Sequence, residues 1–173
     1  MITRGSADLS AFDAVWHEAQ GDPASVEVVG AAGVMAAWIA AQRHDRTAAT
    51  RYLRDHTDLR GDHNLAGCTL MRQGTRALLA LDAGRSAEAE TLAYSVLDRT
   101  GATPSQLLPA QVAAATSHAR GGRGGVWPLL DLALEGHDPD DLMNAGIVWA
   151  ARIEAAWLAG DKDAARAEAE RAL

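Results

Sequence analysis

The sequence predicts an all-α protein, a right-handed superhelical stack of about four helical hairpins preceded by one helix. Apolar residues recur at spacings of three and four along each periodic stretch, which is typical of helices with one buried face. No turn residues flank an alternating apolar and polar run, as they would around a strand. Hydrophobic residues make up 48% of the 173 residues and aromatics only 5%. Because alanine supplies much of the apolar fraction, this composition favours closely packed helices.

Each expected hairpin begins at a helix-start residue and turns at a small or polar one. The starts are Asp22, Asp62, Thr103 and Asp138, and the turns are His44, Gly84, Gly121 and Gly160. A period that varies between about 35 and 41 residues is typical of helical-hairpin repeats. The expected hairpins are therefore 22–60, 62–100, 103–136 and 138–173, in one domain, with a helix from Ser6 to Gln20 before them.

The first two hairpins are predicted from caps and apolar spacing. Asp22 and Pro23 supply a cap and a first-turn proline, and the helix that follows carries Trp38 on its apolar face. The helix after Asp62 ends at Gly84, and apolar residues recur in its partner. These apolar positions are Ala89, Ala93, Val96 and Leu97.

The last two hairpins begin with similar residues. Thr103 and Gln106 form a capping box at the start of the third, and a short helix with Trp127 completes it. In the fourth, Asp138 caps a helix whose apolar stripe runs to the turn at Gly160. The stripe consists of Leu142, Gly146, Trp149, Ala150, Ile153 and Trp157, so Trp149 and Trp157 are predicted to be core residues.

Glycines inside the long helices predict close helix crossings. Each costs roughly 0.5–1 kcal/mol relative to alanine in a helix interior, so a neighbouring backbone is the favoured explanation, and neutral drift is the alternative. These glycines are Gly30, Gly33, Gly67, Gly74 and Gly146.

Charge and cysteine content exclude several classes of protein. The net charge of −7 argues against a nucleic-acid surface, which needs a concentrated positive patch. The single cysteine, Cys68, excludes an internal disulfide and fits a reducing compartment. No apolar run has the length of a signal peptide core or of a membrane span. We therefore expect a soluble cytoplasmic protein that binds neither nucleic acid nor membrane.

No motif predicts catalysis, a metal or a cofactor. The run 121–125 is rich in glycine but lacks the preceding strand and following lysine of a phosphate-binding loop, so it is predicted to be a turn. Asp55, His56, Asp58 and His63 have the atom types that bind divalent metals, yet no ligand spacing. A metal-dependent enzyme using residues 55–63 is the less favoured alternative. Cys68 is predicted to be a buried, inert thiol.

The segment from Ala150 to Asp161, AARIEAAWLAGD, carries a resemblance to a known family. The alanine-rich hairpins resemble tetratricopeptide-like repeats. This segment is similar to part of the helical-repeat region of large ATP-binding LuxR-type transcriptional regulators. The resemblance implies an α-solenoid fold, and an alternative function as a fragment or relative of the sensor or scaffold region of such a regulator.

The favoured function is that of a non-catalytic module that binds a protein or peptide. Arg76 and Arg152 each precede a turn glycine by eight residues, and Arg72 lies one turn from Arg76. These three arginines are predicted to bind carboxylates of a partner. The more ordinary alternative is that each arginine pairs with a carboxylate of its own or the neighbouring hairpin.

An apolar edge at the end of the last helix is also expected, and it would support either self-association or packing against a continuation of the chain. The residues of this edge are Ala165, Ala169, Ala172 and Leu173.

Overall fold

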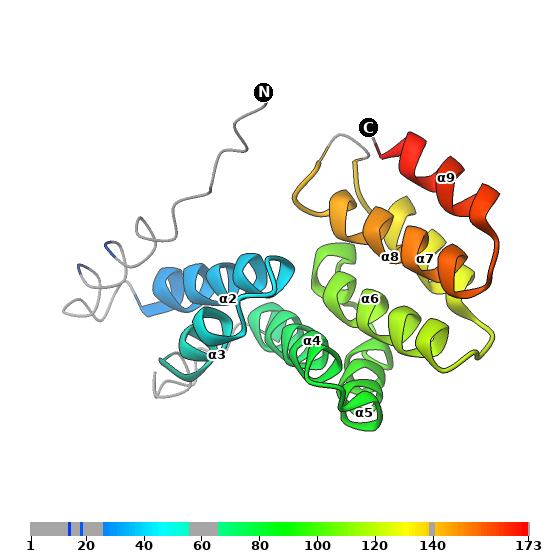
Figure 1. Ribbon diagram of the computed structural model, residues 1–173. Helices are drawn as coiled ribbons and strands as arrows, with labels where there is room; N and C mark the ends of the chain where they lie inside the picture. The colour runs from blue at the N-terminus through cyan, green and yellow to red at the C-terminus, as the bar shows by residue number, and fades with distance from the viewer. Residues whose placement is uncertain (1–13, 15–17, 19–25, 56–65, 139–140, 173) are drawn as a thin grey trace. The chain divides into compact units, whose positions relative to one another are not determined.

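The computed structural model describes residues 14, 18, 26–55, 66–138 and 141–172, which form helices joined by turns (Figure 1). No strand occurs in these ranges, so the all-α prediction is confirmed for them. The expected helix 6–20 lies outside them except for Ala14 and Glu18, which are helical. The helices are α2 (Val26–Gln42), α3 (Arg46–Asp55), α4 (Ala66–Asp82), α5 (Ser86–Leu97), α6 (Pro104–Arg120), α7 (Val126–Glu135), α8 (Ala145–Leu158) and α9 (Lys162–Arg171).

The chain divides into two compact units, residues 1–68 and 69–173, which are described separately. In unit 1, α2 packs against α3. Trp38 is fully buried, as predicted, and Ala49 and Tyr52 of α3 are buried as well. Unit 2 contains nearly all of α4 and the helices that follow it. The expectation that all the hairpins belong to one domain stays a prediction.

In each hairpin a residue with a left-handed backbone follows the end of the first helix. His44, Gly84, Gly122 and Gly160 have φ values of 57°, 75°, 64° and 80° and follow one another at intervals of 38 to 40 residues. The N–H of each donates to the carbonyl three residues earlier, and the next N–H donates to the carbonyl five residues earlier, at 2.8 to 3.1 Å. This is the Schellman motif. The first, second and fourth predicted turns are confirmed, and the third lies at Gly122, one residue after Gly121.

In three of the hairpins the residue after the left-handed one directly precedes the next helix. Asp45 caps α3 and Asp161 caps α9, each through a 2.9 Å hydrogen bond from the N–H three residues further on. Arg85 has the same place before α5. The third hairpin inserts Gly124 and Gly125, so α7 begins two residues later than this pattern would give.

Helix α6 is central in unit 2, where it packs against α5, α7 and α8 (Figure 1). It also meets α4 in an apolar cluster, and α8 packs against both α6 and α7. Within unit 2, the first helices of the third and fourth hairpins, α6 and α8, therefore each contact both helices of the hairpin before them. The α4–α5–α6 cluster is made of small residues, which allow the helices to approach closely: Ala77, Ala93, Val96, Ala110, Ala113 and Ala114.

One of the glycines predicted to mark a helix crossing does so. A Cβ built on Gly74 of α4 would lie 2.9 Å from the Pro109 Cβ and 2.9 Å from the backbone nitrogen of Ala110, both on α6. Gly30 and Gly146 have no such neighbour within 4 Å. The predicted crossing was therefore wrong at these two positions.

The start of α6 agrees with the sequence. The capping box is present, since the Thr103 N–H donates to the Gln106 side chain at 3.0 Å and the Thr103 side chain accepts from the N–H of Gln106. Pro104 occupies the first turn. These local contacts fix where α6 begins.

Helix α8 begins at Ala145, so the predicted start at Asp138 was wrong. The side chain of Asp141 accepts hydrogen bonds of 3.2 and 3.4 Å from the N–H groups two and three residues further on. These bonds hold the chain in a turn before α8. Leu142 lies in this turn and is 72% exposed, so it does not belong to the buried stripe.

Trp157 was also placed wrongly, because its side chain is 62% exposed rather than buried in the core. Ala155 and Ala156 are the buried residues at this end of α8. The Trp157 ring lies at the surface, with the Nζ of Lys162 5.9 Å from its centroid.

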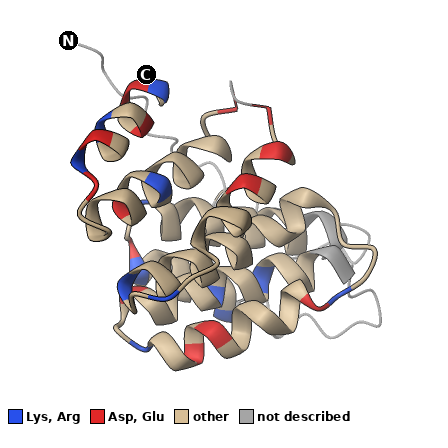
Figure 2. Cartoon of the chain, turned by 90° about the vertical axis from the view of Figure 1, so that its right-hand side faces the viewer, with Lys and Arg blue, Asp and Glu red and all other residues tan. Residues whose placement is uncertain are grey.

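Helix α9 does not present the predicted apolar edge. Ala165 is only 7% exposed, and Ala169 and Ala172 are half-buried. Positive and negative residues are interspersed along α9 (Figure 2). Self-association through this edge therefore has no apolar surface to support it among the described residues, and Leu173 lies outside them. Every exposed residue of α9 is charged: Lys162, Asp163, Arg166, Glu170 and Arg171.

Two tryptophan variants test this assignment of burial. Trp38→Ala should lower the free energy of unfolding by about 3–5 kcal/mol, because removing a fully buried ring leaves a cavity. Trp157→Ala should lower it by less than about 1 kcal/mol, because most of that ring already contacts water. Urea denaturation measures both losses, and equal losses would contradict the structure.

Candidate functional site

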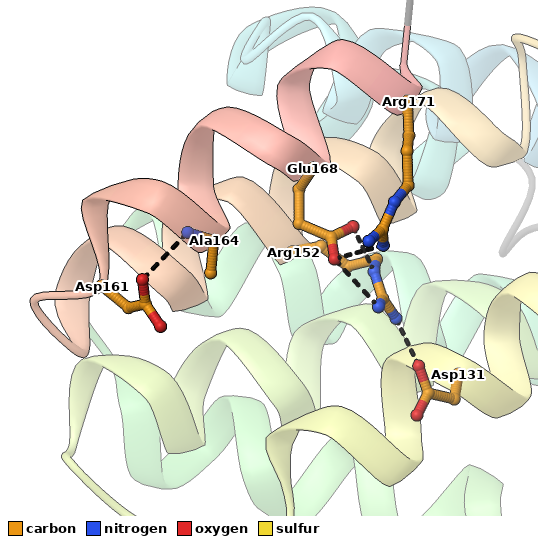
Figure 3. A network of polar contacts seen from close by, with 6 residues as sticks. All are labelled: Asp131, Arg152, Asp161, Ala164, Glu168 and Arg171. Carbon is orange, nitrogen blue, oxygen red and sulfur yellow. Dashed lines mark hydrogen bonds and ion pairs between the residues drawn. The ribbon is translucent and has the colours of Figure 1, made fainter.

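Arg152 projects from α8 into the interior of unit 2, with its side chain 11% exposed. Its Nε and Nη2 donate to the two carboxylate oxygens of Glu168 on α9, at 2.7 and 3.2 Å. Its Nη1 donates to Asp131 on α7. Figure 3 shows the guanidinium between these two carboxylates. Two-pronged pairing of this kind is among the stronger side-chain interactions, so Arg152 ties α7, α8 and α9 together.

Glu168 was not identified from the sequence. Its side chain is 7% exposed, and it also accepts a hydrogen bond of 2.8 Å from Nη1 of Arg171. Glu168 follows the turn residue of its hairpin by eight positions, where the first two hairpins carry Tyr52 and Leu92. An acid at a position that is apolar in the other hairpins was the feature that could have revealed the buried pair.

Two indole rings flank the guanidinium. The Cζ of Arg152 lies 5.1 Å from the centroid of the Trp127 ring and 5.8 Å from that of Trp149. Both distances are within the range of cation–π attraction. Hydrogen bonding to Glu168 raises the pKa of Arg152 above its ordinary value, against the opposing effect of burial. Carboxylates and ring faces thus replace much of the water around this charge.

Arg72 and Arg76 lie one turn apart on α4. Arg76 is exposed and Arg72 is half-buried. No carboxylate among the described residues pairs with either of them. Gly74, which contacts α6, lies on the opposite side of the helix at about 100° per residue. The structure therefore brings Arg72 and Arg76 onto one helix face and places Arg152 elsewhere in unit 2.

Arg76 and Arg152 stand at the same offset from their turn glycines, yet their surroundings differ. In the last hairpin, Glu168 reaches the arginine from the second helix. In the second hairpin the corresponding residue is Leu92, which packs against the apolar cluster. Arg76 consequently has no carboxylate facing it at that position of its own hairpin.

A second polar cluster joins α5 to the α6–α7 turn. Glu90 accepts hydrogen bonds from Nη1 of Arg123 at 2.9 Å and from the hydroxyl of Ser117 at 2.6 Å. Hydrogen bonding to Arg123, and then to Ser117, lowers the pKa of Glu90 from 4.5 to about 2. Glu90 therefore stays ionised through the physiological range.

His118 supports the same turn. Its Nδ1 lies 2.9 Å from the carbonyl oxygen of Gly124, and its Nε2 lies 3.1 Å from the hydroxyl of Tyr94. Because a carbonyl only accepts, Nδ1–H is the donor, and the Nε2 of a neutral ring then accepts from Tyr94. These two contacts stabilise the α6–α7 turn.

Of the less favoured metal candidate, Asp55 belongs to the described ranges, whereas His56, Asp58 and His63 lie outside them. Within the ranges that are described, no three His, Cys, Asp or Glu side chains gather into a group that could hold a metal ion. Cys68 is half-buried, and burial raises the pKa of its thiol. None of the described helices combines the length and apolar character needed to cross a membrane.

Comparison with protein-family models, with curated proteins and with solved structures finds no match in any of the three. The tetratricopeptide-like and LuxR-type resemblances therefore stay predictions. Function has to be argued from the geometry of the hairpins and their arginines.

Substitution of Arg152 tests the buried pair. Arg152→Met should lower the free energy of unfolding by about 3 kcal/mol, because it removes the two-pronged pairing and leaves the buried carboxylate of Glu168 with Arg171 as its remaining charged partner. Combining it with Glu168→Leu, the residue at the matching position of the second hairpin, should recover most of the loss. Urea denaturation of the single and double variants decides this. A double variant as unstable as Arg152→Met would contradict it.

The pKa of Glu90 predicts an acid-sensitive contribution to stability. Because this pKa is depressed in the folded state, the contribution is complete above about pH 4.5 and is lost as pH falls toward 2. The difference in free energy of unfolding between the wild type and Glu90→Gln should therefore shrink over this window. Denaturation at several pH values measures it, and a difference that does not change with pH would count against the Arg123 and Ser117 contacts.

Proposed function

We propose that this chain is a non-catalytic module that binds a protein or peptide partner through tetratricopeptide-like helical hairpins. The observation that carries the proposal is the recurrence of one hairpin geometry, with left-handed turn residues 38 to 40 positions apart. A second observation supports it, since α6 and α8 each pack against the hairpin before them. Repeats joined in this way build extended surfaces that suit partner binding.

The finer part of the proposal is a right-handed superhelix whose first helices face the partner. Helices α2, α4 and α6 have 17 residues each, or about 25 Å at 1.5 Å per residue. A surface of that width accommodates an extended segment or a single helix.

Arg72 and Arg76 are the proposed contacts with the partner. Neither guanidinium has a carboxylate partner among the described residues, and they share one face of α4. Two such charges one turn apart suit an acidic segment, because guanidinium groups pair well with carboxylates. Arg152 fits this role less well, since its guanidinium already binds Glu168 and Asp131.

Charge reversal on α4 tests the proposal. Capture of the native partner from cell extract should fall at least about tenfold with Arg72→Glu combined with Arg76→Glu, because like charges then meet the partner's carboxylates. The helical circular dichroism signal should be unchanged, because Arg76 is exposed and Arg72 only half-buried.

Arg99→Glu is the matched control, since Arg99 is an exposed arginine of the same unit outside α4. It should retain the captured partner. Undiminished capture by the α4 double variant, or an equal loss with Arg99→Glu, would refute Arg72 and Arg76 as the contact.

A further inference from the structure

A hollow of about 310 Å³ opens in unit 2 between the α6–α7 turn and the last turn of α8. Its walls are mainly apolar and include Val126 and Trp127 of α7 and Ala155 and Leu158 of α8. Trp127 is 38% exposed and Leu158 is 48% exposed, so both side chains are accessible at the surface. Binding pockets for small groups begin at about this size and are mainly apolar in the same way.

The hollow lies beside the one hairpin of the four whose turn is longer. Gly124 and Gly125 are the two added residues, and both line the hollow. A Cβ built on Gly124 would meet no atom within 4 Å. The wall formed by these two glycines therefore consists of backbone atoms alone, and there is room for a side chain at Gly124.

The charged side chains at the rim neutralise one another. Arg123 lines the hollow and is paired with Glu90. Arg120 and Glu154, each next in sequence to a lining residue, pair at 2.6 Å. A charged occupant would have to compete with these pairs, whereas an uncharged one would not. Charge complementarity therefore favours an uncharged, apolar group.

The volume of the hollow and the Trp127 ring in its wall favour an aromatic ring as the occupant. An apolar cavity of about 150 Å³ holds a benzene molecule, so about 310 Å³ leaves room for a one- or two-ring side chain. Trp127 offers an indole as part of the wall, and aromatic pairs gain attraction beyond simple burial. Tryptophan is also enriched among the residues that contribute most of the binding free energy at protein interfaces.

We propose that this hollow binds one uncharged aromatic side chain of a protein partner, held against Trp127 and Leu158. The inference rests on the proposed interaction role and adds an apolar anchor to the acidic contact at Arg72 and Arg76. It concerns a different part of unit 2, so the two contacts can be tested independently.

N-acetyltryptophanamide, an uncharged aromatic probe, tests the hollow without the partner. In the wild type it should cause saturable NMR shifts of the Trp127 indole N–H and the Gly124 amide, half-complete at millimolar concentration. N-acetylalaninamide, which lacks the ring, should cause none. The absence of a saturable shift at these two groups in the wild type would overturn the proposal.

Filling the hollow gives the decisive comparison. Gly124→Leu should abolish the probe-induced NMR shift of Trp127. Gly124 lines the hollow and a Cβ there meets no atom within 4 Å, so the leucine side chain would occupy the space that the probe needs. Gly146→Leu is the matched control, since Gly146 also has open space around it but lies near the start of α8. It should bind the probe as the wild type does. Equal binding by both glycine variants would overturn the proposal.

Leu158→Asp provides a second variant that does not depend on the turn, because Leu158 is already half exposed. It should weaken probe binding at least tenfold, and unchanged binding would count against the site. The Arg72→Glu and Arg76→Glu variant should bind the probe normally. Unchanged capture by this α4 variant would refute only the acidic contact, and absence of probe binding in the wild type would refute only the aromatic contact.

Discussion

The buried guanidinium of Arg152 is the constraint on which the last three helices of unit 2 depend. A charge taken out of water is tolerated only where partners replace its hydration. Glu168 and Asp131 supply carboxylates from α9 and α7, and Trp127 and Trp149 supply ring faces. Because Arg152 itself belongs to α8, satisfying its charge fixes three helices relative to one another. These ion pairs link the three helices through one side chain, whatever their net contribution to stability.

The turns act at a more local level and explain why hairpins form at all. Each Schellman turn reverses the chain within one left-handed residue, which Gly84, Gly122 and Gly160 adopt at little cost and His44 adopts as a non-glycine. The small side chains of α4, α5 and α6 then allow neighbouring hairpins to approach closely, as at Gly74. The two added glycines after Gly122 change this pattern once, beside the apolar hollow.

Features set by local sequence could be predicted, and those set by distant contacts could not. Turn glycines and the Thr103 capping box depend on neighbouring residues, so the positions of the turns and the start of α6 followed from the sequence. Trp157 is exposed because no other helix that the structure describes covers its side of α8, and the spacing of apolar residues does not reveal which positions a neighbouring helix covers. The start of α8 was missed because Asp138 is a good capping residue by type, whereas the helix begins only at Ala145, after a turn held by the side chain of Asp141. The distance of Arg152 from the turn at Gly160 singled it out in the sequence. Its partner Glu168 could not be predicted in the same way, because it belongs to another helix.

Native-state hydrogen exchange tests most directly whether Arg152 unites α7, α8 and α9. If it does, the slowest amides of 126–135, 145–158 and 162–171 open together and share one free energy of opening. The account predicts that common value for all three helices in the wild-type protein. Exchange of the α9 amides at a clearly lower free energy than those of α7 and α8 would show that α9 opens alone, and would contradict it.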